Sequence, residues 1–276
     1  MYSLAVTVPK RLLHVSDLHV GRRATPGVAD GLGRLVVELR PEIVLATGDL
    51  AHRGRRAELE QARRTLDALA VPVVAIPGNH DIPYTFPARF TRTWEEFERA
   101  FGPENELYRS ETLVVAGLNS VRPWRHQSGR LSQTQLRRAR EALRDRPPGA
   151  LAVVACHHHL GGSPWRAARK RPLARRDAAL AALVAAGAEV VAGGHIHQAS
   201  VAERKEFETL TGAPAGSAVV ATAPGLGRPR PYRRGEAQGL LAYEWDDREL
   251  TLVTYVWHGE RFHAIAQRRF PRRGSL

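Results

Sequence analysis

Short runs of apolar, mostly β-branched residues recur along the first two hundred positions. They show no alternation of polar and apolar residues, which is typical of strands buried on both faces. The runs lie at 12–16, 43–47, 73–77, 113–118, 151–156 and 190–194. We predict one strand at each run.

A helical pattern lies between the second and third predicted strands, at 55–69. Its apolar residues Leu59, Ala62, Leu66 and Leu69 are spaced three or four positions apart, and arginines lie at 55, 56, 63 and 64. This spacing places the apolar side chains on one face of a helix and leaves the arginines toward solvent. We therefore predict an amphipathic helix here.

Residues typical of helix starts and ends predict two further helices. Ser132 and Gln135 have the spacing of a capping box, so a helix is predicted to begin there. The next is predicted through 173–187, with Pro172 in its first turn and Gly187 at its end. Strands that alternate with helices indicate an α/β domain with a substantial parallel sheet.

The pattern changes at about residue 218. The segments "AVVAT", "GLLAYEW" and "LTLVTYVW" follow one another with short connections and no long helix. We predict antiparallel strands over about 217–270 that complete a second sheet packed on the first. No repeat or linker divides the chain, so residues 1–276 are expected to form a single domain, with its chemistry within 10–200.

Composition sets broad limits. A chain of 276 residues can bury a self-supporting core, and the single cysteine, Cys156, excludes an intramolecular disulfide. No run approaches the ~18 apolar residues of a membrane span. The apolar N-terminus is interrupted by Pro9, Lys10 and Arg11 and lacks a cleavage site, so we expect a cytoplasmic protein.

The chain is strongly basic. It has 41 lysines and arginines against 28 acidic residues, a formal charge of +13. Such a charge attracts nucleic acid, anionic lipid or phosphorylated small molecules, but an arginine-rich proteome produces the same composition. The net charge is therefore compatible with a nucleic-acid partner, but it does not identify the substrate.

Candidate metal ligands follow every predicted strand of this region except the one at 113–118. These residues are Asp17 and His19, Asp49, Asn79 with His80 and Asp81, His157, and His195 with His197. Any one alone is more typical of an ordinary turn. Because the carboxyl ends of parallel strands converge on one edge of a sheet, five such ends together indicate a metal site.

The residue types narrow the choice of metal. Imidazole, carboxylate and amide donors without thiolates suit Mn, Fe, Zn, Ni or Co and argue against an iron–sulfur cluster or a cysteine-zinc site. Even seven of these nine residues are too many ligands for one catalytic ion that keeps an open position. They fit two divalent ions that share a carboxylate, roughly 3.5–4 Å apart, with Mn or an Fe/Mn pair favoured.

These motifs carry a family resemblance. In order, "DLH", "GDL", "GNHD", the histidine after "VVAC" and "GHIH" resemble the motifs of the calcineurin-like metallophosphoesterase superfamily, across residues 12–197. The resemblance implies a four-layer αββα sandwich, in which helices flank two mixed β-sheets. It also implies a ligand set: Asp17, His19 and His197 on one metal, Asn79, His157 and His195 on the other, and Asp49 bridging them.

Three consecutive histidines make one of these assignments ambiguous. The family pattern of a strand ending V-x-x-H, through Val154, places the ligand at His157. His158 is the main competitor and otherwise a neighbour that lines the substrate pocket. His159 occupies a position where relatives often have proline.

The resemblance implies hydrolysis by a metal-bound hydroxide or water. His80, oriented by Asp81, would protonate the leaving oxygen or stabilise the phosphoryl oxygens, whereas His14 and His52 match no ligand position and His126 is expected to be an ordinary polar residue. The bacterial 3′,5′-cyclic-nucleotide phosphodiesterase-like branch is the most similar, which implies a cyclic nucleotide or similar small phosphodiester. A nuclease, an anionic-phospholipid phosphodiesterase and, less favoured, a non-catalytic scaffold stay open, as does the oligomeric state.

Overall fold

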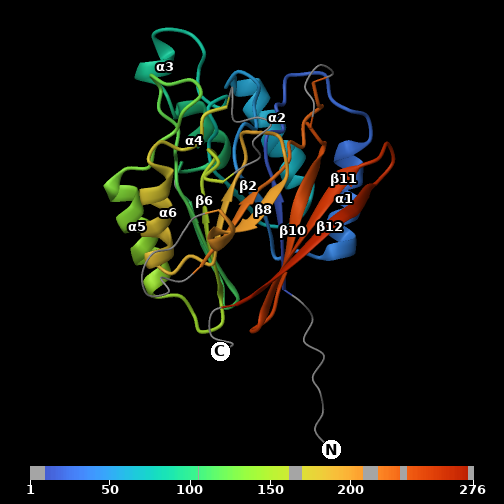
Figure 1. Cartoon of the computed structure of the whole chain (residues 1–276). Helices are drawn as coiled ribbons and strands as arrows, with labels where there is room; N and C mark the ends of the chain where they lie inside the picture. The colour runs from blue at the N-terminus through green and yellow to red at the C-terminus, as the bar shows by residue number, and fades with distance from the viewer. Residues whose placement is uncertain (1–9, 105, 162–169, 208–216, 231–234, 273–276) are drawn as a thin grey trace, which may run out of the picture.

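Two six-stranded sheets form the centre of the molecule (Figure 1). The structure, a computed structural model, describes residues 10–104, 106–161, 170–207, 217–230 and 235–272. The first sheet has the order β12-β11-β10-β1-β2-β3 and the second the order β4-β5-β6-β7-β9-β8. Both are mixed sheets, because parallel strands adjoin antiparallel ones in each.

Every strand predicted in the first two hundred residues is present. The first sheet contains β1 (Lys10–Val15), β2 (Ile43–Ala46), β3 (Val73–Ala75), β10 (Gly239–Trp245), β11 (Glu249–Trp257) and β12 (Phe262–Pro271). The second contains β4 (Leu107–Arg109), β5 (Leu113–Gly117), β6 (Leu151–Ala155), β7 (Val190–Gly193), β8 (Ser200–Glu203) and β9 (Val219–Thr222).

The C-terminal strands are distributed differently from the prediction. Strand β9 lies parallel to β7 in the second sheet, but β10 pairs antiparallel with β1 and extends the first sheet together with β11 and β12. The expectation that residues 217–270 complete the second sheet is therefore wrong for β10 to β12. Apolar patterning identifies strands, whereas the choice of partner depends on which edge is free, and here one edge of β1 accepts β10.

Six α-helices and one short 3₁₀ segment accompany the strands in the described residues. They are α1 (Val28–Leu39), α2 (Arg56–Asp67), α3 (Ala88–Thr91), α4 (Glu95–Phe101), α5 (Gln133–Arg144), α6 (Arg176–Ala185) and η1 (Arg204–Glu206). The apolar face predicted for α2 is buried, and the capping box at α5 is present, with the Ser132 side chain accepting from the Gln135 backbone N–H.

Helix α6 begins later than predicted. Pro172 lies outside the helix, because a continuous α-helix cannot pass through the left-handed Arg175, and the backbone N–H groups of Leu173 and Ala174 donate to the carbonyls of His159 and Gly129. Arg175 then adopts a left-handed conformation at the N-cap. The predicted end is confirmed, since Gly187 has φ +96° just beyond the last turn.

The layers follow from the two faces of each strand. In β1, Leu13 and Val15 pack with α1, α2 and α4, whereas Leu12 points into the core between the sheets. Helices α5 and α6 cover the outer face of the second sheet. Figure 1 shows them on the opposite side of the molecule from α1. The predicted four-layer αββα sandwich is thereby confirmed. No helix of the described residues is long and apolar enough to cross a bilayer.

A buried ion pair joins the two sheets. The guanidinium of Arg272, just after β12, donates to both carboxylate oxygens of Glu189, just before β7, at 2.9 Å each. Further bonds go to the carbonyls of Gly149, Ala150 and Asp246. Both side chains are almost fully buried. Removing one partner of a buried pair leaves an uncompensated charge, which costs more than losing the pair as a whole.

We expect Arg272→Met to lower the free energy of unfolding by roughly 3 kcal/mol, measured by urea denaturation. The double variant Glu189→Gln/Arg272→Met should recover part of this loss, because no buried charge remains unpaired. Arg269→Met removes a mostly exposed arginine of β12 and should change stability by less than about 0.5 kcal/mol. An Arg272→Met protein as stable as the parent would contradict this role.

Candidate functional site

The loops after β1, β2 and β7 have unusual backbone conformations. Among the described non-glycine residues, Asp17, His19, Asp49, His195 and His197 all have positive φ, between 49° and 74°. Such left-handed conformations cost of order 1–3 kcal/mol each and persist where the surrounding structure enforces them. Here Asp17 and His19 donate their backbone N–H groups to the carbonyls of Gly48 and Asp49, at 2.9 Å each. Five of the eight described non-glycine residues with positive φ are therefore predicted ligands.

Two glycines allow the loops after β2 and β3 to touch. Gly48 has φ +88°, and a Cβ at this position would collide with the backbone of Gly78. A Cβ on Gly78 would in turn collide with the backbone and carboxylate of Asp49. The glycines of "GDL" and "GNHD" therefore let Asp49 and Asn79 approach each other.

The predicted ligands form two buried groups. In one, Asp17, His19 and His197 bring one ligating atom each within 4.8 Å of one another, and in the other Asp49, His157 and His195 do the same. In the first group, the Nε2 atom of His197 lies 3.0 Å from Asp17 Oδ1 and 3.2 Å from His19 Nε2.

Asp49 faces both groups. Its Oδ1 atom lies 3.3 Å from His157 Nε2, and its Oδ2 atom lies 3.8 Å from His19 Nε2. The His157 Nε2 atom is also 3.1 Å from His195 Nδ1. The Asp49 carboxylate therefore lies between the two sets of imidazoles.

The other nitrogen of His157 fixes the orientation of its ring. Because the Thr47 carbonyl can only accept, the 2.8 Å bond from His157 Nδ1 makes that nitrogen the donor, and a neutral ring then has its lone pair on Nε2. Burial opposes protonation of His157, but the carboxylate of Asp49 raises its pKa to about 9. Burial likewise opposes ionisation of Asp49, yet His157 and His80 hold its pKa well below the usual value.

Several buried polar atoms of the site lack a hydrogen-bond partner in the described part of the chain. Asp49 Oδ2 and both polar atoms of the Asn79 side chain make no hydrogen bond to any residue that the structure describes. A fully buried amide without partners is costly unless something else satisfies it. Oxygen and imidazole donors in this arrangement fit two divalent cations of the Mn, Fe, Zn, Ni or Co type.

The three consecutive histidines lie in different environments. His157 is the one grouped with Asp49 and His195. The Nδ1 atom of His158 instead bonds the Ser120 hydroxyl at 2.8 Å, and its ring centre lies 4.7 Å from that of His195. Burial, followed by the charge of His157, lowers the pKa of His158 well below its usual value. His158 therefore borders the second group as a neutral ring.

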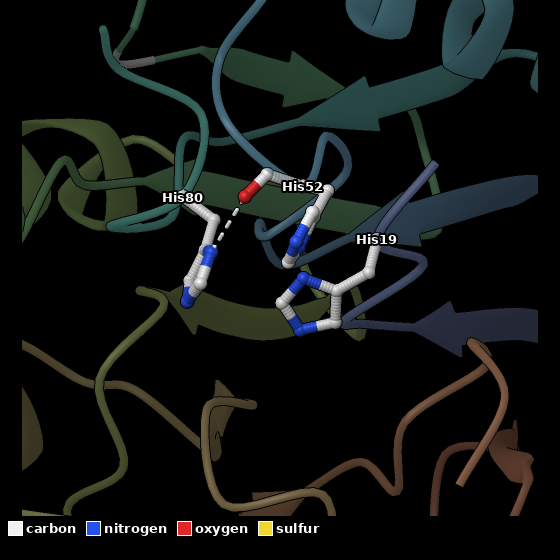
Figure 2. Close-up of side chains that lie close together, drawn as sticks. All are labelled: His19, His52 and His80. Atoms are coloured by element: carbon white, nitrogen blue, oxygen red, sulfur yellow. Dashed lines mark hydrogen bonds between the residues drawn. The ribbon is translucent and has the colours of Figure 1, made fainter. Parts of the chain in front are cut away.

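His80 is held beside both groups by its own backbone and by His52. Its N–H donates to Asp49 Oδ1 at 2.8 Å, and its ring Nδ1 donates to the His52 carbonyl at 2.8 Å (Figure 2). The Tyr84 hydroxyl lies 2.6 Å from the same nitrogen. Because Nδ1 carries the proton in this arrangement, a neutral His80 has its lone pair on Nε2.

Asp81 does not orient His80, contrary to the prediction. Its two carboxylate oxygens accept from the backbone N–H groups of Ala51 and Gly78, at 2.7 Å each. These bonds tie the "GNHD" loop to the loop after Asp49. Burial, together with the negative charge of Asp49, raises the pKa of Asp81 to about 7. Its function in the structure is to position the loop.

His52 and His126 are closer to the site than the sequence suggested. The ring of His52 stacks on that of His80 at 5.8 Å and meets His19 edge-on at 6.1 Å (Figure 2). The ring of His126 lies 5.7 Å from that of His80. One available signal was position, since His52 follows Asp49 by three residues in "GDLAH". His19, His52 and His80 form a third histidine group beside the first, with His19 in both.

A buried network of hydrogen bonds helps to hold His157 in position. His14 bonds the Tyr243 hydroxyl at 2.8 Å and the Thr47 hydroxyl at 2.9 Å, and the Thr47 carbonyl holds His157. Burial lowers the pKa of His14 to about 3, although Asp17 opposes this. A neutral His14 thus connects β1, β2 and β10 directly behind the site.

Comparisons with known proteins agree with this geometry. Residues 10–199 match the calcineurin-like phosphoesterase family. The glycerophosphodiester phosphodiesterase GpdQ of Enterobacter lignolyticus is 36% identical over 80 residues, which cover 25% of this chain and 29% of that protein. The cAMP/cGMP dual specificity phosphodiesterase of Mycobacterium tuberculosis is 28% identical over 202 residues, covering 67% and 61%. The chain thus spans less than two thirds of either relative.

A solved structure supports the fold independently. Purple acid phosphatase PPD1 from yellow lupin seeds superposes with a TM-score of 0.72 over 96% of this chain and 54% of that one, at 14% identity. This likeness concerns the fold alone. The match over residues 10–199 shows that the chain belongs to the calcineurin-like phosphoesterase family, as its motifs predicted.

The pKa of His14 predicts an acid-sensitive fold. The unfolded state takes up a proton at the ordinary His pKa of 6.5, whereas the folded state does so at about 3. Stability is therefore lost as the pH falls from 6.5 toward 3, by about 2 kcal/mol at pH 5 for this one group. Urea denaturation of metal-free protein should show a His14→Gln variant that is less stable at pH 8 but loses about 2 kcal/mol less on going to pH 5.

His258→Gln is the matched control, because His258 is exposed. It should keep the pH dependence of the parent protein. Equal pH dependence in His14→Gln and the parent would show that His14 is not buried in its neutral form.

Proposed function

We propose that this chain hydrolyses small organic phosphodiesters at two divalent metal ions. The position of Asp49 carries the proposal, because its two oxygens face different groups of imidazoles. A carboxylate shared in this way is what a two-ion site requires. Asp17, His19 and His197 would hold one ion, Asn79, His157 and His195 the other, and Asp49 both.

The charges of the site favour an anionic substrate. Asp17 and Asp49 contribute two negative charges against four positive charges of two divalent ions, so the site stays positive. The bound ions would polarise the phosphate oxygens and lower the pKa of an attacking water. The neutral donors Asn79, His19 and His197 hold this charge without cancelling it.

His80 would supply the proton for the leaving oxygen. The His52 carbonyl accepts from Nδ1 and fixes the ring, which leaves Nε2 to exchange a proton with the substrate. The half-buried position of His80 lets a substrate reach it. Tyr84, whose hydroxyl contacts the ring, helps to hold this orientation.

The favoured substrate is a cyclic nucleotide or another small phosphodiester. The support comes from the two relatives, whose names describe phosphodiesterases for cyclic nucleotides and glycerophosphodiesters. A nuclease or anionic-phospholipid activity rests on the net charge of +13 alone. A non-catalytic scaffold is disfavoured, because every expected donor is present and buried. Manganese, or iron with manganese, is the favoured metal content.

Asp49→Asn tests the shared carboxylate. We expect the parent protein to contain two divalent ions per chain and to hydrolyse bis(p-nitrophenyl) phosphate with added manganese. The variant should lose metal and at least about 10³-fold in kcat/KM, because both ions lose a ligand charge. Asp67→Asn, at an exposed carboxylate of α2, is the control and should match the parent. An Asp49→Asn protein with two ions and normal turnover would refute the shared site.

His80→Ala tests the proton donor. The variant should retain both ions and lose roughly 10²- to 10⁴-fold in kcat for a substrate with an alcohol leaving group. The loss should be smaller for bis(p-nitrophenyl) phosphate, since p-nitrophenolate leaves without protonation. His258→Ala should be unaffected. Equal losses on both substrates would assign His80 to binding of the phosphoryl group instead.

A further inference from the structure

A cavity of about 220 Å³ lies beside the loop that carries Asp17 and His19. Its floor is apolar and formed by Leu18, Val20, Val28, Ala29, Leu32 and Leu226. Leu18 lies between the two expected ligands in sequence, and the first turn of α1 forms one wall. The cavity therefore adjoins the site through a single stretch of chain.

Three arginines line the same cavity. These are Arg22, Arg23 and Arg228, and none of them forms an ion pair with a carboxylate of the described residues. Arg230 lies close by, but its side chain pairs with Glu236 at 3.2 Å. Partial burial and the charge of Arg230, followed by that of Arg228, lower the pKa of Arg22, against the opposing charge of Glu236. Glu236 already pairs with Arg230, so it offsets the positive charges at the cavity only in part, and a bound anion would relieve the remaining repulsion.

Backbone hydrogen bonds connect the segment that carries Arg22 to His19 and His52. The Arg22 backbone N–H donates to the His19 carbonyl at 3.2 Å, and that of His52 donates to the Val20 carbonyl at 2.8 Å. His52 also feels the charge of Arg22, which adds to burial and His80 in lowering the pKa of His52. A substrate held beside His80 would therefore reach Arg22 by extending past His52.

The two parts of the cavity define its ligand. A bare anion would use the arginines but gain nothing from the leucine and valine floor, whereas an uncharged organic group would leave the arginines unpaired. We propose that the cavity binds the organic group of the substrate and that this group carries a second phosphate, held by Arg22 and Arg228. This inference rests on the proposed phosphodiesterase function and names its substrate class: small phosphodiesters with an additional phosphate.

A matched pair of substrates tests the second phosphate. The p-nitrophenyl ester of thymidine 5′-phosphate and its 3′-phosphorylated analogue react identically: water adds to the 5′ phosphorus, the bond to p-nitrophenolate breaks, and the water protons pass to solvent. They differ only in the 3′-phosphate. The parent protein should prefer the 3′-phosphorylated ester by about tenfold or more in kcat/KM, mainly through KM.

Two arginine variants identify the contact. Arg22→Gln and Arg228→Gln should each bring the preference toward one, by raising KM for the 3′-phosphorylated ester more than for the ester without the 3′-phosphate. Arg137→Gln removes the same charge from the exposed face of α5 and should keep the preference. A parent protein without the preference, or arginine variants that keep it, would overturn the subsite.

A binding measurement separates this proposal from the proposed function. If the parent hydrolyses none of these esters with added manganese, the phosphodiesterase proposal fails. Calorimetry with thymidine 3′,5′-bisphosphate and thymidine 5′-phosphate then tests the subsite without turnover. Tighter binding of the bisphosphate that is lost in Arg22→Gln supports the subsite, and equal binding of the two nucleotides overturns it.

Discussion

The structure depends most on the burial of the Asp49 carboxylate between imidazoles from distant parts of the chain. A buried carboxylate is stable only with opposite charge or hydrogen-bond donors close to both oxygens. His157 and the backbone N–H of His80 face one oxygen, whereas the other lies 3.8 Å from His19 Nε2 without a hydrogen bond in the described residues, which leaves it for a cation. To meet this requirement, the loops after β1, β2, β3 and β6 must converge around Asp49. This convergence fixes the position of one sheet relative to the other.

The expected ligand set also explains where the protein tolerates backbone strain. Five of its members have left-handed φ values, and Gly48 and Gly78 remove the side chains that would keep two loops apart. Away from this edge, the network of His14, Thr47 and Tyr243 holds the strands with ordinary buried hydrogen bonds. Strain is thus concentrated where donors converge, and the layers behind it are conventional.

Much of this arrangement could be predicted from the sequence because its signals are local. Continuous apolar runs identify buried strands, and the side chains after them mark one edge of a parallel sheet. The features that the sequence analysis predicted wrongly depend on tertiary structure. Nothing near Pro172 indicates that the N–H groups of Leu173 and Ala174 bond to distant loops. The partners of Asp81 and the stacking of His52 on His80 likewise depend on how two loops meet, which residue type and spacing do not encode.

The pairing of β1 with β10 has a consequence for biosynthesis. Leu13 lies opposite Ala242, so β1 is synthesised more than two hundred residues before the strand that covers one of its edges. Contacts between such distant segments are slow to form, and an open apolar edge is a site for wrong pairing with other chains. The nascent chain can build the second sheet and its two covering helices first. The first sheet is completed only when β10, β11 and β12 have left the ribosome, so deletion of these three strands should expose β1.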